Sequence, residues 1–374
     1  MRSRRELKKP PAILTPCKAA VLLAVLASAG CGRRAPAAVQ RGRDVYAQLC
    51  ATCHGASGEG YVADNAPSLR NPNFLASASD AYLNAAITRG RPGTAMGAYG
   101  RALGGPLPPE DVNAVVAYLL AGGPRRLQLP SDRVAGDATR GQPLYQNLCS
   151  RCHGTRTQRA SAVHLANPIL LQTASDAFLR FAVVEGRLPT AMVAWKGQLS
   201  LLQIDDVVAY VRSLEEPPGI PAVPPPPAAP GPPAAPRTGP IVLNPRGRAP
   251  AFTLKEDRFV SIDQVKKALD EKRRVVITDA RTPSDWLNLH IKGAISTPYY
   301  DARSLDDIPN DGTWVLAYCA CPHHVSGEVV DALRKRGYQH AAVIDEGIFA
   351  WQQKGYPVVM APGMRPPPTP PPPK

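Results

Sequence analysis

The sequence predicts a multidomain protein, in which two all-α domains are followed by one α/β domain with a parallel sheet. Three observations lead to this prediction. One set of motifs occurs twice in the first half of the chain, a proline-rich stretch follows, and beyond it apolar runs of strand length alternate with helical segments. Such alternation is typical of a parallel sheet. A chain of 374 residues is also long enough for roughly two or three domains.

Residues 1–31 have the pattern of a secretory signal peptide. A basic start precedes the apolar run Ala19–Ala29, which is shorter than the roughly 20 apolar residues that a membrane-spanning helix needs. The run ends in Ser28-Ala29-Gly30-Cys31, which resembles the lipobox of bacterial lipoproteins and implies lipidation of Cys31. Ser28 stands where that family usually has Leu, so ordinary cleavage and a soluble protein are the alternative. We expect an exported, periplasmic protein, which lipidation would anchor to the cell membrane or outer membrane.

The motif Cys-x-x-Cys-His occurs twice, at Cys50–His54 and Cys149–His153. It is the attachment signature of c-type haem, in which two thiols form thioether bonds to the porphyrin and the histidine ligates the iron. One copy alone would also be compatible with a redox dithiol or a zinc site. Two copies in matching surroundings favour haem. We therefore predict two covalently bound haem c groups, attached through Cys50, Cys53, Cys149 and Cys152.

The first repeat, residues 40–122, is predicted to be a set of helices around a loop. Apolar residues at helical spacing lead into Cys50. A second helix is predicted over residues 80–87 behind a Ser or Asp cap. Residues 91–96 are expected to form a loop, and a last helix opens at Pro109.

The second repeat, residues 132–216, has the same order of motifs. The matching positions include Gly42 with Gly141, Tyr46 with Tyr145, and Thr94-Ala95-Met96 with Thr190-Ala191-Met192. The offsets between matching residues are nearly constant, so a duplicated domain is the simplest explanation.

Both repeats resemble class I c-type cytochromes in their order of helix, Cys-x-x-Cys-His, loop methionine and final helix. The resemblance implies that His54 and His153 are the proximal iron ligands and that Met96 and Met192 are the distal ones. His54 is the only histidine of the first repeat, which supports Met96 independently unless another domain supplies a ligand. A lone methionine is often a core residue, and His164 competes with Met192, but position and duplication favour the methionines. Ligation by one histidine and one methionine raises the reduction potential of the haem relative to ligation by two histidines.

Residues 217–250 are rich in proline and are predicted to form a semi-rigid linker, extended at about 3 Å per residue in the polyproline II conformation. A binding site for a proline-recognising domain is the alternative. Residues 361–374 have the same composition and are predicted to be a disordered tail.

Residues 251–360 are predicted to form the α/β domain. The predicted strands are residues 275–279, 314–318 and 341–344, and the predicted helices open at Ser261 and cover residues 327–336.

An ordered set of motifs in this domain resembles the rhodanese-like family. The matching motifs are Asp279-Ala280-Arg281, His290–Ile295, the cysteine that follows Tyr318, Glu346-Gly347 with Ala350-Trp351, and Gly355-Tyr356-Pro357. The resemblance implies that Cys319 is the nucleophile that takes a sulfane sulfur from a small sulfur anion, thiosulfate or a persulfide. In that family, backbone amides and the next helix cradle the anion and lower the pKa of the thiol.

The loop Cys319–Ser326 departs from the pattern of that family. The Gly and Arg residues of active members are missing, the loop is slightly longer, and His323 and His324 could supply partial positive charge. A second thiol, Cys321, could resolve a persulfide, form a Cys-x-Cys disulfide or act as the nucleophile itself. The alternatives are a metal held by these cysteines and histidines, a persulfide reserve, redox sensing, and a catalytically silent binding module.

The formal net charge of +14 bears on the partners. No nucleic-acid-binding motif accompanies the charge, so we expect no nucleic acid and favour acidic redox partner proteins, with a generic basic surface as the alternative. Four cysteines belong to the haem motifs, and the others are Cys17, Cys31, Cys319 and Cys321. They do not form a disulfide framework.

Together these features predict an exported dihaem cytochrome that performs one-electron transfer, with a domain that binds or transfers sulfane sulfur. The first alternative is a sulfur-compound oxidoreductase, in which Cys319 and the haems oxidise thiosulfate or a persulfide. The second is an electron carrier whose last domain only docks a partner.

Overall fold

The computed structural model describes residues 35–63, 65–215, 239–320 and 323–361. The predicted signal peptide with Cys31, most of the proline-rich linker, Cys321 and the tail lie outside the described residues. Among the residues that are described, every helix is too short or too polar to cross a membrane.

The first repeat folds into short helices, as its spacing predicts. They are α1 (Ala37–Leu49), α2 (Ala51–His54), α3 (Pro72–Ser77), α4 (Asp80–Arg89) and α5 (Pro109–Leu120), with a 3-10 turn at Arg101–Leu103. Helix α4 begins where predicted because the hydroxyl of Ser79 accepts a hydrogen bond from the Tyr82 amide at 3.0 Å. It runs two residues beyond the predicted end and stops at Gly90, whose φ is +66°.

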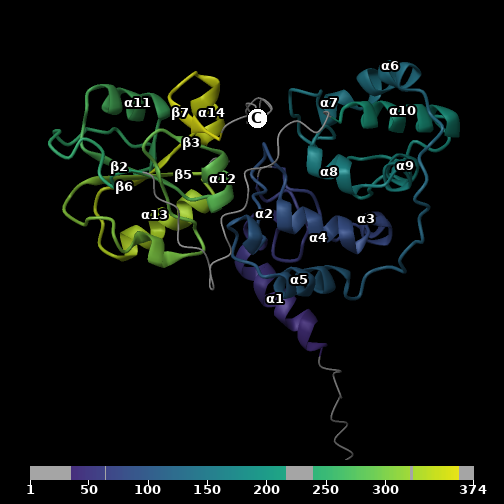
Figure 1. Ribbon diagram of the computed structural model, residues 1–374, viewed down its shortest axis with the longest axis horizontal. Helices are drawn as coiled ribbons and strands as arrows, with labels where there is room; N and C mark the ends of the chain where they lie inside the picture. Colours follow the sequence, from purple (N-terminus) through teal and green to yellow (C-terminus); the bar gives the residue numbers. More distant parts are fainter. Residues whose placement is uncertain (1–34, 64, 216–238, 321–322, 362–374) are drawn as a thin grey trace, which may run out of the picture. The chain divides into compact units, whose positions relative to one another are not determined.

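The second repeat has the same elements in the same order. They are α6 (Ala138–Leu148), α7 (Ser150–His153), α8 (Pro168–Thr173), α9 (Asp176–Glu185) and α10 (Leu201–Ser213). In each repeat the first helix packs against the last, α1 on α5 and α6 on α10 (Figure 1).

A glycine lies at the point where each of these helix pairs crosses. A Cβ atom on Gly42 would lie 1.9 Å from the carbonyl oxygen of Ala114, and one on Gly141 would lie 1.9 Å from that of Asp206. The two backbones therefore approach more closely than any side chain would allow. Beside each crossing an exposed arginine forms a bidentate ion pair with an aspartate of the last helix, Arg41 with Asp111 and Arg140 with Asp206.

The α/β domain is built on a five-stranded parallel sheet of order β1-β6-β5-β2-β4, with an antiparallel pair of β3 and β7 beside it. The strands are β1 (Phe259–Val260), β2 (Val275–Asp279), β3 (Leu289–Ile291), β4 (Ile295–Ser296), β5 (Trp314–Tyr318), β6 (Ala341–Ile344) and β7 (Val358–Met360). The helices are α11 (Ile262–Asp270), α12 (Pro283–Asn288), α13 (Val325–Lys335) and α14 (Gly347–Gln353), with a 3-10 turn at Ala302–Leu305.

Alternate residues of the central strands face two separate cores. Ile277 and Leu316 belong to the core that includes Trp351 of α14, whereas Val276 and Val315 belong to the core that includes Leu333 of α13. Both faces of the sheet are covered, which explains why β2, β5 and β6 are mostly apolar segments that could be predicted from sequence (Figure 1).

The glycine crossings give a first prediction. Gly42→Ala and Gly141→Ala should each lower the free energy of unfolding by about 1–3 kcal/mol, because the added methyl group forces two backbones apart. This cost outweighs the gain of about 1 kcal/mol in helix propensity. Thermal unfolding followed by far-ultraviolet circular dichroism measures the change.

Arg43→Ala on the exposed side of α1 is the control, and its effect should stay within about 0.5 kcal/mol. Equal unfolding midpoints for Gly42→Ala and Arg43→Ala would mean that the helices do not cross this closely.

Candidate functional site

Each Cys-x-x-Cys-His motif forms a single helical turn at the end of the first helix of its repeat. The amide of His54 donates to the carbonyl oxygen of Cys50 at 2.9 Å, and the amide of Cys53 donates to the same oxygen at 3.2 Å. The second motif has the same bonds, from His153 and Cys152 to Cys149, at 2.9 and 3.1 Å. Cysteines three residues apart on such a turn lie on the same side of it. Both sulfurs can therefore reach one edge of a flat ring.

The motif histidines are held in the tautomer that a metal needs. Nδ1 of the buried His54 lies 2.9 Å from the carbonyl oxygen of Pro67, and Nδ1 of His153 lies 2.7 Å from that of Val163. A carbonyl only accepts, so Nδ1 carries the proton and Nε2 keeps its lone pair. Burial lowers the pKa of both imidazoles, against the opposing effect of the carbonyl bond. Both histidines are therefore neutral near pH 7.

A buried tyrosine fixes the turn that follows each histidine. The hydroxyl of Tyr46 donates to the carbonyl oxygen of Gly55 at 2.8 Å, and that of Tyr145 donates to Gly154 at 2.9 Å. Both glycines have positive φ, +84° and +77°, which explains why a residue without a Cβ follows each motif. The two sites therefore share their supporting contacts as well as their motifs.

Residues 91–96 and 187–192, called here the methionine loops, are closed by matching hydrogen bonds. The amide of Arg91 donates to the carbonyl oxygen of Met96 at 2.7 Å, and the amide of Arg187 donates to that of Met192 at 2.7 Å. Inside each loop the methionine amide donates to a threonine hydroxyl, that of Thr94 at 3.1 Å or that of Thr190 at 3.2 Å. Both methionines are half-buried at the end of a closed loop.

The residues of each site fit a haem c. A neutral buried imidazole, two thiols on one helical turn, and a thioether in a closed loop form the donor set of a His/Met haem. In His164, the competing ligand, Nε2 lies 2.7 Å from the carbonyl oxygen of Thr155, so that Nδ1 is the nitrogen that keeps a lone pair.

Cys319 is the first residue after β5, at the carboxyl edge of the parallel sheet. Its side chain is only 1% exposed, its Sγ lies 3.2 Å from the hydroxyl of Ser326, and its carbonyl oxygen accepts the amide of Ile348 at 3.0 Å. Ser326 lies in the first turn of α13, so this thiol lies beside the amino end of a helix, as the resemblance implies. Sequence reasoning missed Ser326, although a hydroxyl in the first turn after a cysteine loop is a readable signal.

His323 forms an ion pair and a ring contact that the sequence did not predict. Its Nε2 pairs with a carboxylate oxygen of Asp345, and its ring packs on Phe259 with centroids 4.0 Å apart. Its φ is +80°, an uncommon conformation for a residue with a Cβ. Among the residues described, no group of three or more His, Cys, Asp or Glu side chains could hold a metal ion.

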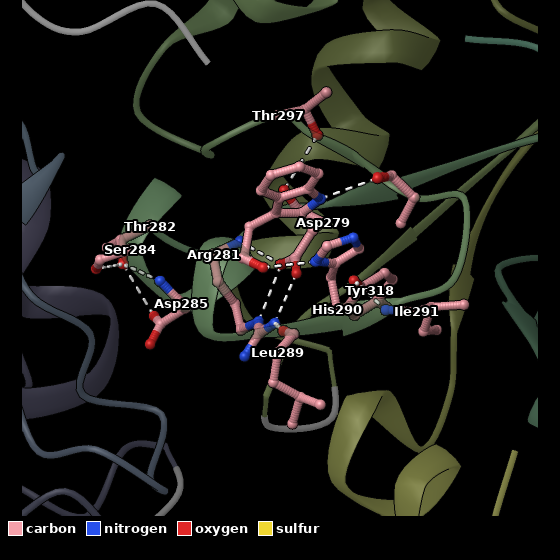
Figure 2. A network of polar contacts seen from close by, with 12 residues as sticks. Asp279, Arg281, Thr282, Ser284, Asp285, Leu289, His290, Ile291, Thr297 and Tyr318 are labelled. Carbon is pink, nitrogen blue, oxygen red and sulfur yellow. Dashed lines mark hydrogen bonds and ion pairs between the residues drawn. The ribbon is translucent and has the colours of Figure 1, made fainter. Parts of the chain in front are cut away.

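A buried polar network stabilises the edge of the sheet from which Cys319 emerges (Figure 2). Arg281 binds Asp279 through Nε at 2.9 Å and Nη2 at 2.6 Å, and it donates to the carbonyl oxygen of Leu289 at 2.5 Å. Burial lowers the pKa of Arg281, but the carboxylate of Asp279 more than offsets this effect, so the pKa stays above its usual value. Tyr318, next to Cys319, accepts the amide of Ile291 on its hydroxyl at 3.0 Å. The network therefore ties the ends of β2 and β5 to β3.

Two family models match the chain, in line with these sites. The model described as cytochrome C oxidase, cbb3-type, subunit III matches residues 37–119 and again residues 136–211. The model described as rhodanese-like domain matches residues 261–354. The chain therefore contains two cytochrome c domains followed by a rhodanese-like domain, and the predicted fold class is confirmed. Cytochrome c domains of this kind bind haem c covalently.

The relatives of this chain match either its cytochrome region or its rhodanese-like domain. The cbb3-type cytochrome c oxidase subunit CcoP of Azospirillum sp. (strain B510) is 30% identical over 195 residues, which are 47% of this chain and 62% of the relative. The subunit FixP of Bradyrhizobium sp. (strain ORS 278) is 29% identical over 184 residues, 46% of this chain and 60% of the relative. The chain thus spans about three fifths of the length of these relatives.

The rhodanese-like domain has a relative of its own. The probable adenylyltransferase/sulfurtransferase MoeZ of Mycobacterium tuberculosis (strain ATCC 25618 / H37Rv) is 32% identical over 97 residues, which are 25% of this chain and 24% of the relative.

The buried network gives a second prediction. Arg281→Met should lower the free energy of unfolding of the rhodanese-like domain by about 3–5 kcal/mol, because it leaves the carboxylate of Asp279 buried and unpaired. Denaturant unfolding followed by tryptophan fluorescence reports on this domain, which holds three of the four tryptophans, Trp286, Trp314 and Trp351.

Lys267→Met is the matched control, because it breaks an exposed ion pair with Glu271 on α11 and should cost about 1 kcal/mol or less. If Arg281→Met unfolds at the same denaturant concentration as this control, the buried ion pair does not support the domain.

Proposed function

We propose that this protein is an exported dihaem cytochrome that transfers single electrons, with one haem c in each cytochrome domain. The observation that carries the proposal is the duplicated site, in which matching turns, histidine tautomers and closed methionine loops occur at equivalent places. The covalent attachment residues are Cys50, Cys53, Cys149 and Cys152, and the axial ligands are His54 with Met96 and His153 with Met192.

In this proposal the chain's own residues set the state of each ligand. When bound, haem supplies a one-electron ferric–ferrous couple. The carbonyl oxygens of Pro67 and Val163 hold the protons of His54 and His153 on Nδ1, so that the lone pair of Nε2 would be available to a metal. Met192 is favoured over His164 because its loop is closed by the same hydrogen bonds as the loop of Met96.

The proposed partners are redox proteins. The relatives named CcoP and FixP are subunits of cbb3-type cytochrome c oxidases, which supports an oxidase as one electron-accepting partner. The net charge of +14 would favour an acidic docking surface on such a partner. We propose a periplasmic location and a lipid anchor on Cys31 from the sequence pattern alone.

A third prediction tests the haem assignment. The holoprotein should carry two covalent haems by mass, and Met96→Ala or Met192→Ala should each lower the midpoint potential of one haem. The expected shift is on the order of 0.1 V, within the range of about 0.8 V over which axial ligands set haem potentials. Spectroelectrochemical titration measures both potentials.

Met360→Leu in β7 is the control for this experiment and should move neither potential. A covalent haem count other than two would refute the dihaem proposal. If His164→Ala shifts a potential and Met192→Ala does not, His164 is the ligand.

A second candidate function arises from Cys319, which lies beside Ser326 and the first turn of α13. In this candidate the Cys319 thiolate attacks the sulfane sulfur of thiosulfate, the sulfur–sulfur bond breaks, sulfite leaves, and a persulfide forms on the protein. This transfer is redox-neutral. Oxidation of this persulfide would need water to add a hydroxyl group to the outer sulfur, with release of two protons and two electrons, one electron for each ferric haem. Such a step would make the chain a sulfur-compound oxidoreductase, whereas a silent domain would only dock a partner.

A fourth prediction separates these functions. Anaerobic mixing of oxidised holoprotein with thiosulfate should reduce the haems only if the sulfur and haem chemistries are coupled, and Cys319→Ser should then abolish the absorbance change. Cys321→Ser shows which thiol acts. Haems that ascorbate reduces but thiosulfate does not would leave an electron carrier without sulfur oxidation.

A further inference from the structure

The two cytochrome domains meet through helices α3, α4, α8 and α9, and a buried asparagine from the first domain reaches into the second. Asn71 is 3% exposed and caps α3, where its Oδ1 accepts the amide of Phe74 at 2.9 Å. Its Nδ2 donates to the carbonyl oxygens of Arg187 at 2.7 Å and Leu188 at 2.8 Å. The cap uses only the oxygen of this amide, so the nitrogen is left for the other domain.

The second domain returns the contact from the equivalent residue. Asn167 is 2% exposed and caps α8, where its Oδ1 accepts the amides of Ile169 and Leu170. Its Nδ2 donates to the carbonyl oxygen of Pro92 at 3.0 Å. Pro92 and Leu188 hold the same place in the two repeats, immediately after Arg91 and Arg187. The interface is therefore reciprocal.

The acceptors of these bonds are the first residues of the methionine loops. Arg187 and Leu188 open the loop that closes on Met192, and Pro92 is the second residue of the loop that closes on Met96. Each loop is thus held from inside by its own closing bond and from outside by an asparagine of the other domain. An unpaired buried amide or carbonyl would be costly, so these contacts constrain both loops.

Aromatic rings support the same arrangement. Tyr82 of α4 and Phe178 of α9 face each other across the interface with centroids 4.9 Å apart. The guanidinium of Arg91 lies 5.2 Å from the Tyr82 ring, and that of Arg187 lies 5.3 Å from the Phe178 ring. Burial lowers the pKa of Arg187 to about 10, so the side chain is still charged near pH 7. Each of these arginines opens one of the methionine loops.

We propose that each cytochrome domain positions the distal iron ligand of the other: Asn71 is a positioning residue for Met192, and Asn167 is one for Met96. The inference rests on the proposed methionine ligation. It makes the haem sites interdependent, because a change at one helix cap alters the ligand loop in the neighbouring domain.

Asn71→Ser and Asn167→Ser test this inference in the full-length holoprotein. A serine hydroxyl still caps a helix, but it lacks the amide donor that reaches the other domain. Asn71→Ser should accelerate hydrogen exchange of the amides of Arg187, Thr190 and Met192 roughly tenfold, the factor expected for losing a hydrogen bond of ordinary net strength. Asn167→Ser should do the same for residues 91–96. In both cases the loop of the variant's own domain should keep its exchange rate.

A spectroscopic measurement follows the ligand itself. In a Met96→Ala background only the second haem can show the absorption band of ferric iron bound to a thioether. There Asn71→Ser should weaken this band and lower the potential of that haem, and Asn167→Ser should not. In a Met192→Ala background only the first haem can show the band, and there Asn167→Ser should weaken it whereas Asn71→Ser should not.

Ser79→Ala is the matched control, because among the described residues the hydroxyl of Ser79 caps a helix of its own domain and makes no hydrogen bond to the other domain. Responses confined to the variant's own domain, or equal responses from Ser79→Ala, would overturn the inference. A wild-type holoprotein without the thioether band would instead refute the methionine ligation of the proposed function. A band that is present but insensitive to the crossed variants overturns only the inference.

Discussion

The hydrogen bond from a histidine Nδ1 to a backbone carbonyl is the interaction on which the rest of the cytochrome region depends. His54 makes it to Pro67 and His153 makes it to Val163. A buried imidazole without a partner would be costly, and a partner that accepted from Nε2 would remove the lone pair that the proposed iron ligation needs. The loop after each motif must therefore return to the histidine. The glycine with positive φ after each histidine and the buried tyrosine bonded to it fix the start of that loop.

The sequence was enough to predict the elements and motifs that depend on residue type. It was not enough to predict contacts in which the partner is a backbone atom or belongs to another domain. Strands β2, β5 and β6 were predicted with their observed bounds because nearly all of their residues are buried and most are apolar, whereas β1, β3, β4 and β7 are two or three residues long and show no periodicity. Pro67 and Val163 act through their carbonyls, which any residue could supply. The Asn-Pro pairs at residues 71 and 167 were readable as helix caps, but nothing local indicated their second contact.

In the rhodanese-like domain the loop after Cys319 departs from the family pattern, but the buried polar network beside it does not. From the sequence, His323 and His324 could supply partial positive charge where the arginine is missing. In the structure His323 pairs with Asp345, which follows β6, and its ring lies on Phe259. Any positive charge on His323 is therefore offset by a carboxylate. The Asp279–Arg281 pair, part of the motif that resembles the family, is buried and intact, so the scaffold is kept although the cysteine loop has diverged.

The reciprocal asparagine contacts have a consequence for the origin of the chain. In these contacts each domain uses the same residue, the capping asparagine, to bind the same loop of the other domain. Two identical subunits related by a twofold axis make contacts of this kind, which define an isologous dimer interface. Duplication and fusion of a gene whose single-domain product already formed a homodimer would give this arrangement without creating any new contact. Fusion would also make the association independent of protein concentration, because the two halves can no longer dilute apart.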